Sequence, residues 1–193
     1  CDKDPPPLPP AGAPPPTEPP LPRRLGLVAG LPFPSRPLRV AIPDVGRTVV
    51  AETHVPLALD HRHDRELDRA TLLLSDMLES VDASFSDLLA VGIALPAPID
   101  TNTGMIATPG LLRGWENVRV AEVMTNRIEV PVFVDNEANL GGLAEVRSGA
   151  ARGTRGAVYI RVGHGVSAGL VINGAIYRGV TGKAGQNGDG TIY

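Results

Sequence analysis

An apolar segment that ends in three consecutive polar residues places the strongest constraint on the fold of this chain. Residues 130–134, Val-Pro-Val-Phe-Val, show no apolar/polar alternation, and the chain continues through Asp135, Asn136 and Glu137 into a helical pattern. A run without alternation predicts a strand buried on both faces, as in a mostly parallel sheet. The polar residues then fall at the carboxyl end of a strand, where open α/β sheets bind ligands. A second interpretation stays open, in which Asp135 and Asn136 only cap the helix.

The bulk properties exclude several classes of protein. With 193 residues, 42% of them hydrophobic, the chain can form one domain or two small ones. A net charge of −3 provides no basic face for nucleic acid, so we expect any DNA-binding element to lie outside this chain. Cys1 is the only cysteine, which excludes a disulfide framework and a thiolate zinc site and fits a reducing cytoplasm. No apolar run has the length of a membrane span, so we expect no membrane contact.

Composition divides the chain into three parts. Eleven prolines stand between Pro5 and Pro22, which predicts an extended, disordered segment over residues 1–24 that serves as a linker or as a ligand for a proline-binding domain. Residues 25–125 are predicted to form an N-terminal α/β lobe, and residues 126–193 the start of a C-terminal α/β lobe. Because the chain begins with cysteine and the second lobe is short, we expect it to be incomplete at both ends.

The spacing of apolar residues predicts strands and helices in an α/β order. The expected strands cover residues 25–30, 38–42, 48–55, 88–95, 130–134, 157–162, 170–172 and 175–178. The expected helices cover residues 67–81, 121–128 and 138–148. In the last helix we expect an inner face formed by Leu140, Leu143, Ala144 and Val146.

Two polar or glycine-rich turns are candidate binding sites. Between Asp60 and Asp64, the spacing of His61 and His63 could hold a metal, but no third ligand lies nearby and a solvated turn is the simpler interpretation. The glycine-rich turn from Gly163 to Gly169 follows a strand and could present backbone N–H groups to a phosphate. No helix follows that turn and neither G-x-G-x-x-G nor G-K-[ST] is present, so no dinucleotide fold or P-loop is predicted.

Several segments together, in their order and spacing, resemble the ROK family of repressors, open reading frames and kinases. They are residues 92–100, 114–115, 134–139, 144–145 and 163–169. The resemblance covers roughly residues 25–188 and implies the actin-like, ribonuclease-H-like sugar kinase fold, with two α/β lobes around a cleft for a sugar and, in the kinases, ATP. Some members of this family phosphorylate sugars, whereas others sense them and carry an N-terminal winged helix for DNA.

The resemblance assigns a sugar site to four residues. Glu137 stands at the position of the catalytic base of the kinases, which is an aspartate, and Asn136 stands at a sugar-contacting position. Gln186 and Asp189 align with a Gly-Glu-Ile-Gly-His motif of the family, although an aspartate cannot replace the histidine that usually binds zinc there. The resemblance therefore implies sugar contacts by these four residues, and a base at Glu137 that is impaired.

The phosphate-binding part of the kinase pattern is less complete. Gly163, Gly165 and Gly169 match a loop that faces nucleotide phosphates in the family. Pro32 and Pro34 stand where the kinases have an aspartate and a glycine, and proline supplies neither a carboxylate for Mg²⁺ nor an N–H for phosphate. The glutamate also reaches one methylene further than aspartate, and misplacing a base by about 1 Å can cost about two orders of magnitude in rate.

These departures predict the sugar-sensing effector domain of a ROK-type transcriptional regulator. Alternatives are an ATP-dependent, glucokinase-like sugar kinase and a truncated member that binds no ligand. A sensor must recognise hydroxyl groups but needs neither Mg²⁺ nor in-line geometry. We expect a monosaccharide or sugar phosphate as ligand, no metal site, no cofactor except ATP and Mg²⁺ under the kinase alternative, a cytoplasmic location and a homo-oligomer when complete.

Overall fold

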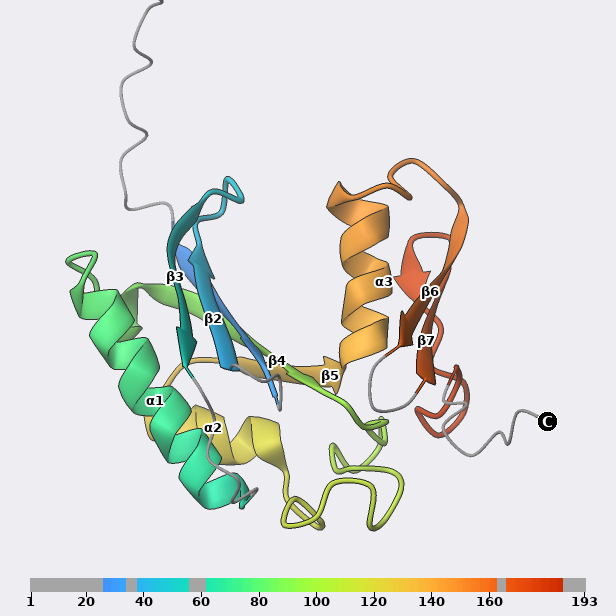
Figure 1. The fold of residues 1–193 in the computed structure, drawn as a ribbon, viewed down its shortest axis with the longest axis horizontal. Helices are drawn as coiled ribbons and strands as arrows, with labels where there is room; N and C mark the ends of the chain where they lie inside the picture. Colours follow the sequence, from blue (N-terminus) through green and yellow to red (C-terminus); the bar gives the residue numbers. More distant parts are fainter. Residues whose placement is uncertain (1–25, 34–37, 56–61, 163–165, 186–193) are drawn as a thin grey trace, which may run out of the picture.

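The chain folds into two α/β units, which a computed structural model describes for residues 26–33, 38–55, 62–162 and 166–185 (Figure 1). The first unit has a five-stranded sheet in the order β3-β2-β1-β4-β5, and the second a three-stranded sheet in the order β6-β7-β8. The strands are β1 (Leu27–Pro32), β2 (Leu38–Pro43), β3 (Val49–Val55), β4 (Leu88–Leu95), β5 (Val132–Asn136), β6 (Gly156–Val162), β7 (Val166–Ile172) and β8 (Ala175–Ile176). The helices are α1 (His63–Glu79), the 3₁₀ turn η1 (Phe85–Asp87), α2 (Val120–Ile128) and α3 (Glu137–Ser148).

The first sheet brings three strand ends to one edge. Strands β1, β2 and β3 pair antiparallel, whereas β4 runs parallel to β1 and β5 runs parallel to β4. The carboxyl ends of β1, β4 and β5 therefore meet, and Ala94 of β4 stands opposite Asp135 of β5. This edge is where the sequence predicts a ligand site, and the α/β character that it predicts is confirmed.

The core of the first unit lies between this sheet and the helices α1 and α2, which both cover one face (Figure 1). Alternation in β1 buries Leu27, Ala29 and Leu31 toward these helices and turns Gly30 and Pro32 to the opposite face. Helix α1 contributes apolar residues spaced three and four apart, including Leu67, Ala70 and Leu74, as its periodicity predicts. Among the described residues, no helix is both long and apolar enough to cross a membrane.

An aromatic cluster fastens the loop after β4 to the first sheet. Trp115 is 1% exposed, and its ring lies 5.6 Å from Phe33 and 6.3 Å from His63 between centroids. The Nδ1 atom of His63 also lies within hydrogen-bond distance of the Gly114 carbonyl oxygen. The single tryptophan is therefore a buried packing residue that holds the start of α1 and this loop together.

The prediction that residues 130–134 are buried on both faces is wrong. Val132 is 8% exposed, but its neighbour Phe133 is 68% exposed. In the described chain β5 is an edge strand and α2 covers only one of its faces, so alternate side chains have no neighbour to pack on. The sheet also extends past residue 125, where the sequence predicts the first lobe to end, because β5 pairs with β4.

Helix α3 packs closely on the second sheet through its smallest residues. Its buried residues are Ala138, Asn139, Gly142 and Val146, while Ala144 is exposed, so the inner face predicted from the leucines is wrong in part. A Cβ atom at Gly169 of β7 would lie 2.0 Å from the carbonyl oxygen of Ala138. The helix is rotated toward its small residues because only they allow its backbone to approach β7 this closely.

The glycine-rich turn is shorter than the sequence predicts. Strand β7 begins at Val166 and pairs with β6 through its whole length, so residues 166–169 belong to the sheet. Gly169 faces Tyr159 in the β6–β7 register and packs against α3. The other strands and helices predicted from the sequence are confirmed, with ends that differ by a few residues.

The close approach of α3 to β7 yields a stability test. We expect Gly169→Ala to lower the free energy of unfolding by about 2–3 kcal/mol or more, because the added methyl group overlaps the backbone of α3. Gly156→Ala is the matched control in the neighbouring strand, since its Cβ would meet the Val171 carbonyl oxygen at an ordinary 3.5 Å. Urea denaturation of both variants measures the difference, and equal stabilities would contradict the packing argument.

Candidate functional site

Asn136 joins the first sheet to α3 and caps that helix. Its Oδ1 accepts hydrogen bonds from the backbone N–H groups of Ala138, at 2.8 Å, and Asn139, at 3.4 Å. Its Nδ2 lies 3.5 Å from the Leu95 carbonyl oxygen, and the residue is 1% exposed. The capping interpretation is therefore confirmed for Asn136, while its contact with a sugar stays a prediction.

Asp135 is the centre of a buried polar network at the same junction. One carboxylate oxygen, Oδ1, accepts from the backbone N–H of Asn136 at 2.7 Å and from Nδ2 of Asn139 at 2.9 Å. The other, Oδ2, accepts from Nε of Arg178 at 3.0 Å and from its Nη2. The side chain of Asp135 is 10% exposed, so both oxygens are satisfied by protein groups. Arg178 follows β8, and this ion pair therefore ties the two units together.

Glu137 is held by an arginine from the second sheet. Nη1 of Arg161, on β6, lies 2.7 Å from Oε1 of Glu137, whose side chain is 11% exposed. This contact follows from the way α3 lies on β6. Tyr159 of β6 lies against Gly141 of α3. Arg161 is two strand residues beyond Tyr159 and Glu137 is about one helical turn before Gly141, and both steps span about 6 Å, so the two side chains meet. Burial raises the pKa of Glu137 above its ordinary value, and the Arg161 guanidinium partly opposes that shift.

The segment from Tyr177 to Gly185 leaves the second sheet, passes along the first unit and returns to β7 at Gly185. At Gly182 it runs so close to the loop after β4 that a Cβ atom there would lie 1.9 Å from the Ile99 carbonyl oxygen. The neighbouring Asp100 has a lowered pKa, mainly because the backbone N–H groups of Thr103 and Asn102 donate to it and also because Lys183 is nearby. At the far end of α3, Nη1 of Arg47 donates to Ser148 Oγ at 3.0 Å. Contacts therefore join the two units at both ends of α3.

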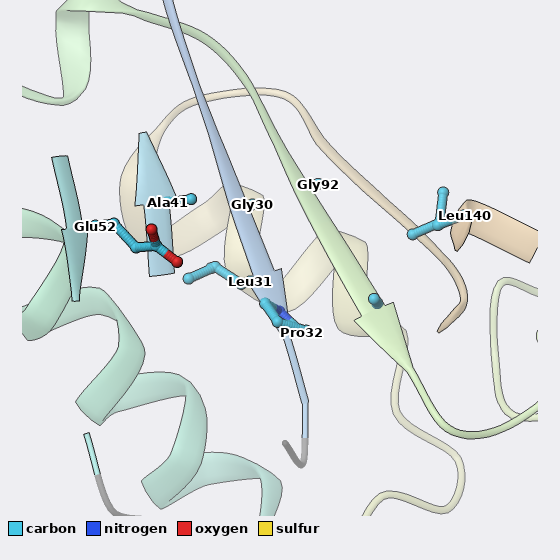
Figure 2. A pocket seen from close by; sticks show the side chains of 8 residues that line it. Gly30, Leu31, Pro32, Ala41, Glu52, Gly92 and Leu140 are labelled. Atoms are coloured by element: carbon cyan, nitrogen blue, oxygen red, sulfur yellow. The ribbon is translucent and has the colours of Figure 1, made fainter. Parts of the chain in front are cut away.

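An open depression of about 380 Å³ lies on the face of the first sheet that α1 and α2 leave uncovered. Figure 2 shows Gly30, Pro32 and Gly92 on its floor, with Leu140 of α3 on the other side. Its remaining lining residues are Leu31, Ala41, Glu52 and Ala94. Leu140, one turn from Glu137, is the residue by which α3 lines this depression. Apart from the Glu52 carboxylate, the side chains that line it are apolar.

The structure brings together only some of the residues assigned from the sequence. Glu137 and Asn136 lie side by side at the junction, while Gly169 lies in β7 and not in a turn. The remaining assigned residues, Gln186, Asp189, Gly163 and Gly165, lie outside the described residues, as does His61. Within the described ranges, no three His, Cys, Asp or Glu side chains are arranged to hold a metal.

The sequence analysis missed the two arginines that pair with the acids. The sequence gives a misleading signal for Arg161, because the alternation of β6 places Val158, Ile160 and Val162 on one apolar face, whereas the structure turns the face of Ala157, Tyr159 and Arg161 inward. A cation at such a position predicts a buried acidic partner. Which acid it meets depends on how α3 packs on β6, and no local pattern contains that information.

Known proteins of two kinds are similar to this chain. The ROK family matches residues 39–192. A putative xylose repressor from Caldicellulosiruptor sp. (strain Rt8B.4) is 26% identical over 170 residues, covering 88% of this chain and 42% of the repressor. A glucokinase from Halalkalibacterium halodurans is 33% identical over 132 residues, covering 65% of this chain and 40% of the glucokinase. The chain thus spans about two fifths of the length of these relatives.

The fold is shared with solved structures. The ROK family glucokinase from Streptomyces griseus, solved in complex with glucose and AMPPNP, superposes with a TM-score of 0.72 at 22% identity. The superposition covers 83% of this chain and 49% of the glucokinase. The predicted actin-like, ribonuclease-H-like α/β fold is therefore confirmed.

The partly buried carboxyl of Glu137 makes stability depend on pH. Because its folded-state pKa is raised, its contribution to stability is fully present below the ordinary value of 4.5 and is lost as pH rises through the raised value. Glu137→Gln removes the buried charge, so we expect this variant to be more stable than the unmodified chain at pH 7, with the difference shrinking as pH falls toward 4.5. Thermal denaturation of both chains between pH 4.5 and pH 7 measures this difference in stability.

The matched control for this substitution is Glu122→Gln, which removes an exposed carboxylate on α2. We expect it to change the free energy of unfolding by no more than about 0.5 kcal/mol. If Glu137→Gln instead destabilised the chain most at neutral pH, the ion pair with Arg161 would outweigh the burial of the carboxylate.

The Asp135–Arg178 pair yields a second test of the junction. We expect Arg178→Gln and Asp135→Asn each to lower the free energy of unfolding by about 1–3 kcal/mol, because the first leaves the mostly buried Asp135 carboxylate without its cation and the second removes the charge that both Arg178 and the buried network hold. The double variant should lose less than the sum of the two. Arg119→Gln, which breaks an exposed pair on α2, is the control and should cost less than about 1 kcal/mol. Simple additivity in urea denaturation would show that the two side chains do not interact.

Proposed function

This chain belongs to the ROK family, and from that premise we propose that it is the sugar-binding effector domain of a ROK-type transcriptional regulator. Its ligand is a monosaccharide or sugar phosphate that binds at the β5–α3 junction, in contact with Glu137. The DNA-binding element of the regulator lies outside this sequence, and the complete protein acts in the cytoplasm. In this proposal the two units respond to the sugar and no phosphoryl group is transferred.

The observation that carries this proposal is the chemistry of the depression that Leu140 of α3 lines, one helical turn from Glu137. A kinase of this fold needs groups that hold the phosphates and Mg²⁺ of ATP next to the base. The described side chains there are apolar, and Pro32, at the end of β1, has no N–H to donate. The single carboxylate, Glu52, is exposed on β3 and lies 3.7 Å from His54. These residues fit ATP and Mg²⁺ poorly.

The pairing of Glu137 also favours binding over catalysis. A general base needs a free lone pair directed at the proton that it removes. Oε1 of Glu137 is already occupied by Arg161, so only Oε2 could accept a proton, and the orientation of the carboxylate is fixed by the ion pair. A carboxylate that is fixed in this way can still accept a hydrogen bond from a sugar hydroxyl.

A sugar kinase is the second candidate function. It is favoured by the similarity to the glucokinase, which is 33% identical over 132 residues. Similar relatives therefore include a kinase as well as a repressor. Fold and family are shared by both classes, and the choice between them depends on the side chains of the site. The residues described above favour the regulator.

Sugar binding without turnover is the expected experimental result. We expect one of D-xylose, D-glucose or N-acetyl-D-glucosamine to stabilise the chain, by about 2.7 kcal/mol at a concentration 100 times its Kd, because it binds only the folded state. Thermal unfolding and isothermal titration calorimetry measure this binding. With ATP and Mg²⁺ added, ADP should form no faster than in the absence of sugar.

Two outcomes would reject the regulator proposal. Turnover near the 1–100 s⁻¹ that is typical of kinases, within an order of magnitude, would establish the kinase instead. If none of these sugars or their 6-phosphates shifted the unfolding temperature at roughly millimolar concentration, the chain would not be a sugar-binding domain of ordinary affinity.

A further inference from the structure

We propose that Arg161 is a positioning residue of the ligand site, which orients the carboxylate of Glu137 and keeps it ionised as a hydrogen-bond acceptor for a ligand hydroxyl. The part concerning the ligand rests on the proposed function. The part concerning the two side chains rests on their contact alone and can be tested without a ligand.

The first argument is geometric. Glu137 is the first residue of α3, and its carboxylate would rotate freely if nothing held it. Arg161 approaches Oε1 from β6 at 2.7 Å, and among the described residues no group donates to Oε2. One oxygen is therefore fixed, and the other has no donor within the described ranges. Leu140, one turn along the helix, lines the depression, and the proposed ligand would reach Glu137 from that side.

The second argument concerns charge. A protonated carboxyl is partly a donor, whereas a carboxylate is an acceptor only and suits a sugar hydroxyl that donates. Burial at this position favours the protonated form, and Arg161 is the cation that opposes it. Among the described residues, the other nearby cation, Arg178, is paired with Asp135. The remaining titratable residue on this part of β6 is Tyr159, which lies against Gly141, and β7 contains no titratable residue.

A purely structural role would be to fasten α3 to β6, but other contacts already do so. The backbone of α3 packs directly on Gly169 of β7, and Gly141 and Gly142 lie against Tyr159. The side chain of Arg161 is 38% exposed, so its removal leaves no deep cavity. Arg161→Gln leaves the mostly buried carboxylate of Glu137 without its cation, so we expect it to lower the free energy of unfolding and to remain folded, and its binding is compared at a temperature where it is fully folded.

The test compares Arg161→Gln with Arg161→Lys and the unmodified chain. The probe is whichever of D-xylose, D-glucose and N-acetyl-D-glucosamine stabilises the unmodified chain most, and its Kd is measured by calorimetry from pH 5 to pH 8. We expect Arg161→Gln to weaken binding by about tenfold or more and to lose affinity on acidification at a higher pH than the unmodified chain. Arg161→Lys, which keeps the cation, should recover most of the affinity and the original pH profile.

Glu137→Gln supplies the control for this profile. It should bind the same sugar weakly with little pH dependence between pH 5 and pH 8, and adding Arg161→Gln to it should change the Kd little further. If Arg161→Gln weakened binding equally at all pH values, or had the same effect with and without Glu137, then Arg161 would act independently of Glu137 and the proposal would be wrong.

A measurement without ligand separates this proposal from the proposed function. The ¹³C signal of the Glu137 carboxyl, assigned from its absence in Glu137→Gln, reports the protonation midpoint directly. We expect the midpoint to be higher in Arg161→Gln than in the unmodified chain, and an unchanged midpoint would overturn the pairing. If the midpoint moves but no sugar binds any variant, the side-chain pairing stands, and both the proposed function and the ligand role of Arg161 are rejected.

Discussion

A carboxylate that is nine-tenths buried has to be paired, and the arrangement of the two units depends on how Asp135 is satisfied. Its two oxygens accept from the start of α3 and from Arg178 of the second unit. Burying this charge without such donors would cost several kcal/mol. The end of β5, the first turn of α3 and the segment after β8 are therefore held in one network. That network places Glu137 at a fixed point on the edge of the first sheet.

The second constraint is the close packing of α3. Small residues on its inner face let its backbone touch β7, and this contact fixes the rotation of the helix. The same rotation puts Glu137 beside Arg161 and Leu140 beside the uncovered face of the first sheet. Structural glycines and the residues of the candidate site are thus parts of one interface. Contacts at both ends of α3 couple the positions of the two units.

Relatives named as repressors and as a glucokinase belong to this family, so the same fold accommodates both kinds of protein. In this chain a carboxylate, that of Glu137, stands at the start of α3, where the proposed function needs recognition of a ligand hydroxyl. Phosphoryl transfer further requires phosphate and metal ligands beside a free base. In this chain the residue at the end of β1 is proline and the carboxylate is paired with arginine. Both differences are local, and neither disturbs the packing of the fold.

The sequence by itself determined the order of strands and helices, the α/β class, the N-cap at Asn136 and the family resemblance. These are carried by short-range periodicity, by a capping residue next to its helix and by motifs in a fixed order. It misjudged the burial of Phe133, because an apolar strand has the same sequence whether one or both faces are covered. It also assigned Gly169 to a turn when that residue lies inside β7.

Only the tertiary structure decided which cation meets which acid. Arg161 lies 24 residues from Glu137 in the sequence, and Arg178 lies 43 residues from Asp135. Their pairing follows from the register of α3 on β6 and from the path of the chain after β8, both of which are set by long-range packing. The polar residues at the β5–α3 junction could be recognised from the sequence, but their ionic partners, and therefore their chemistry, could not.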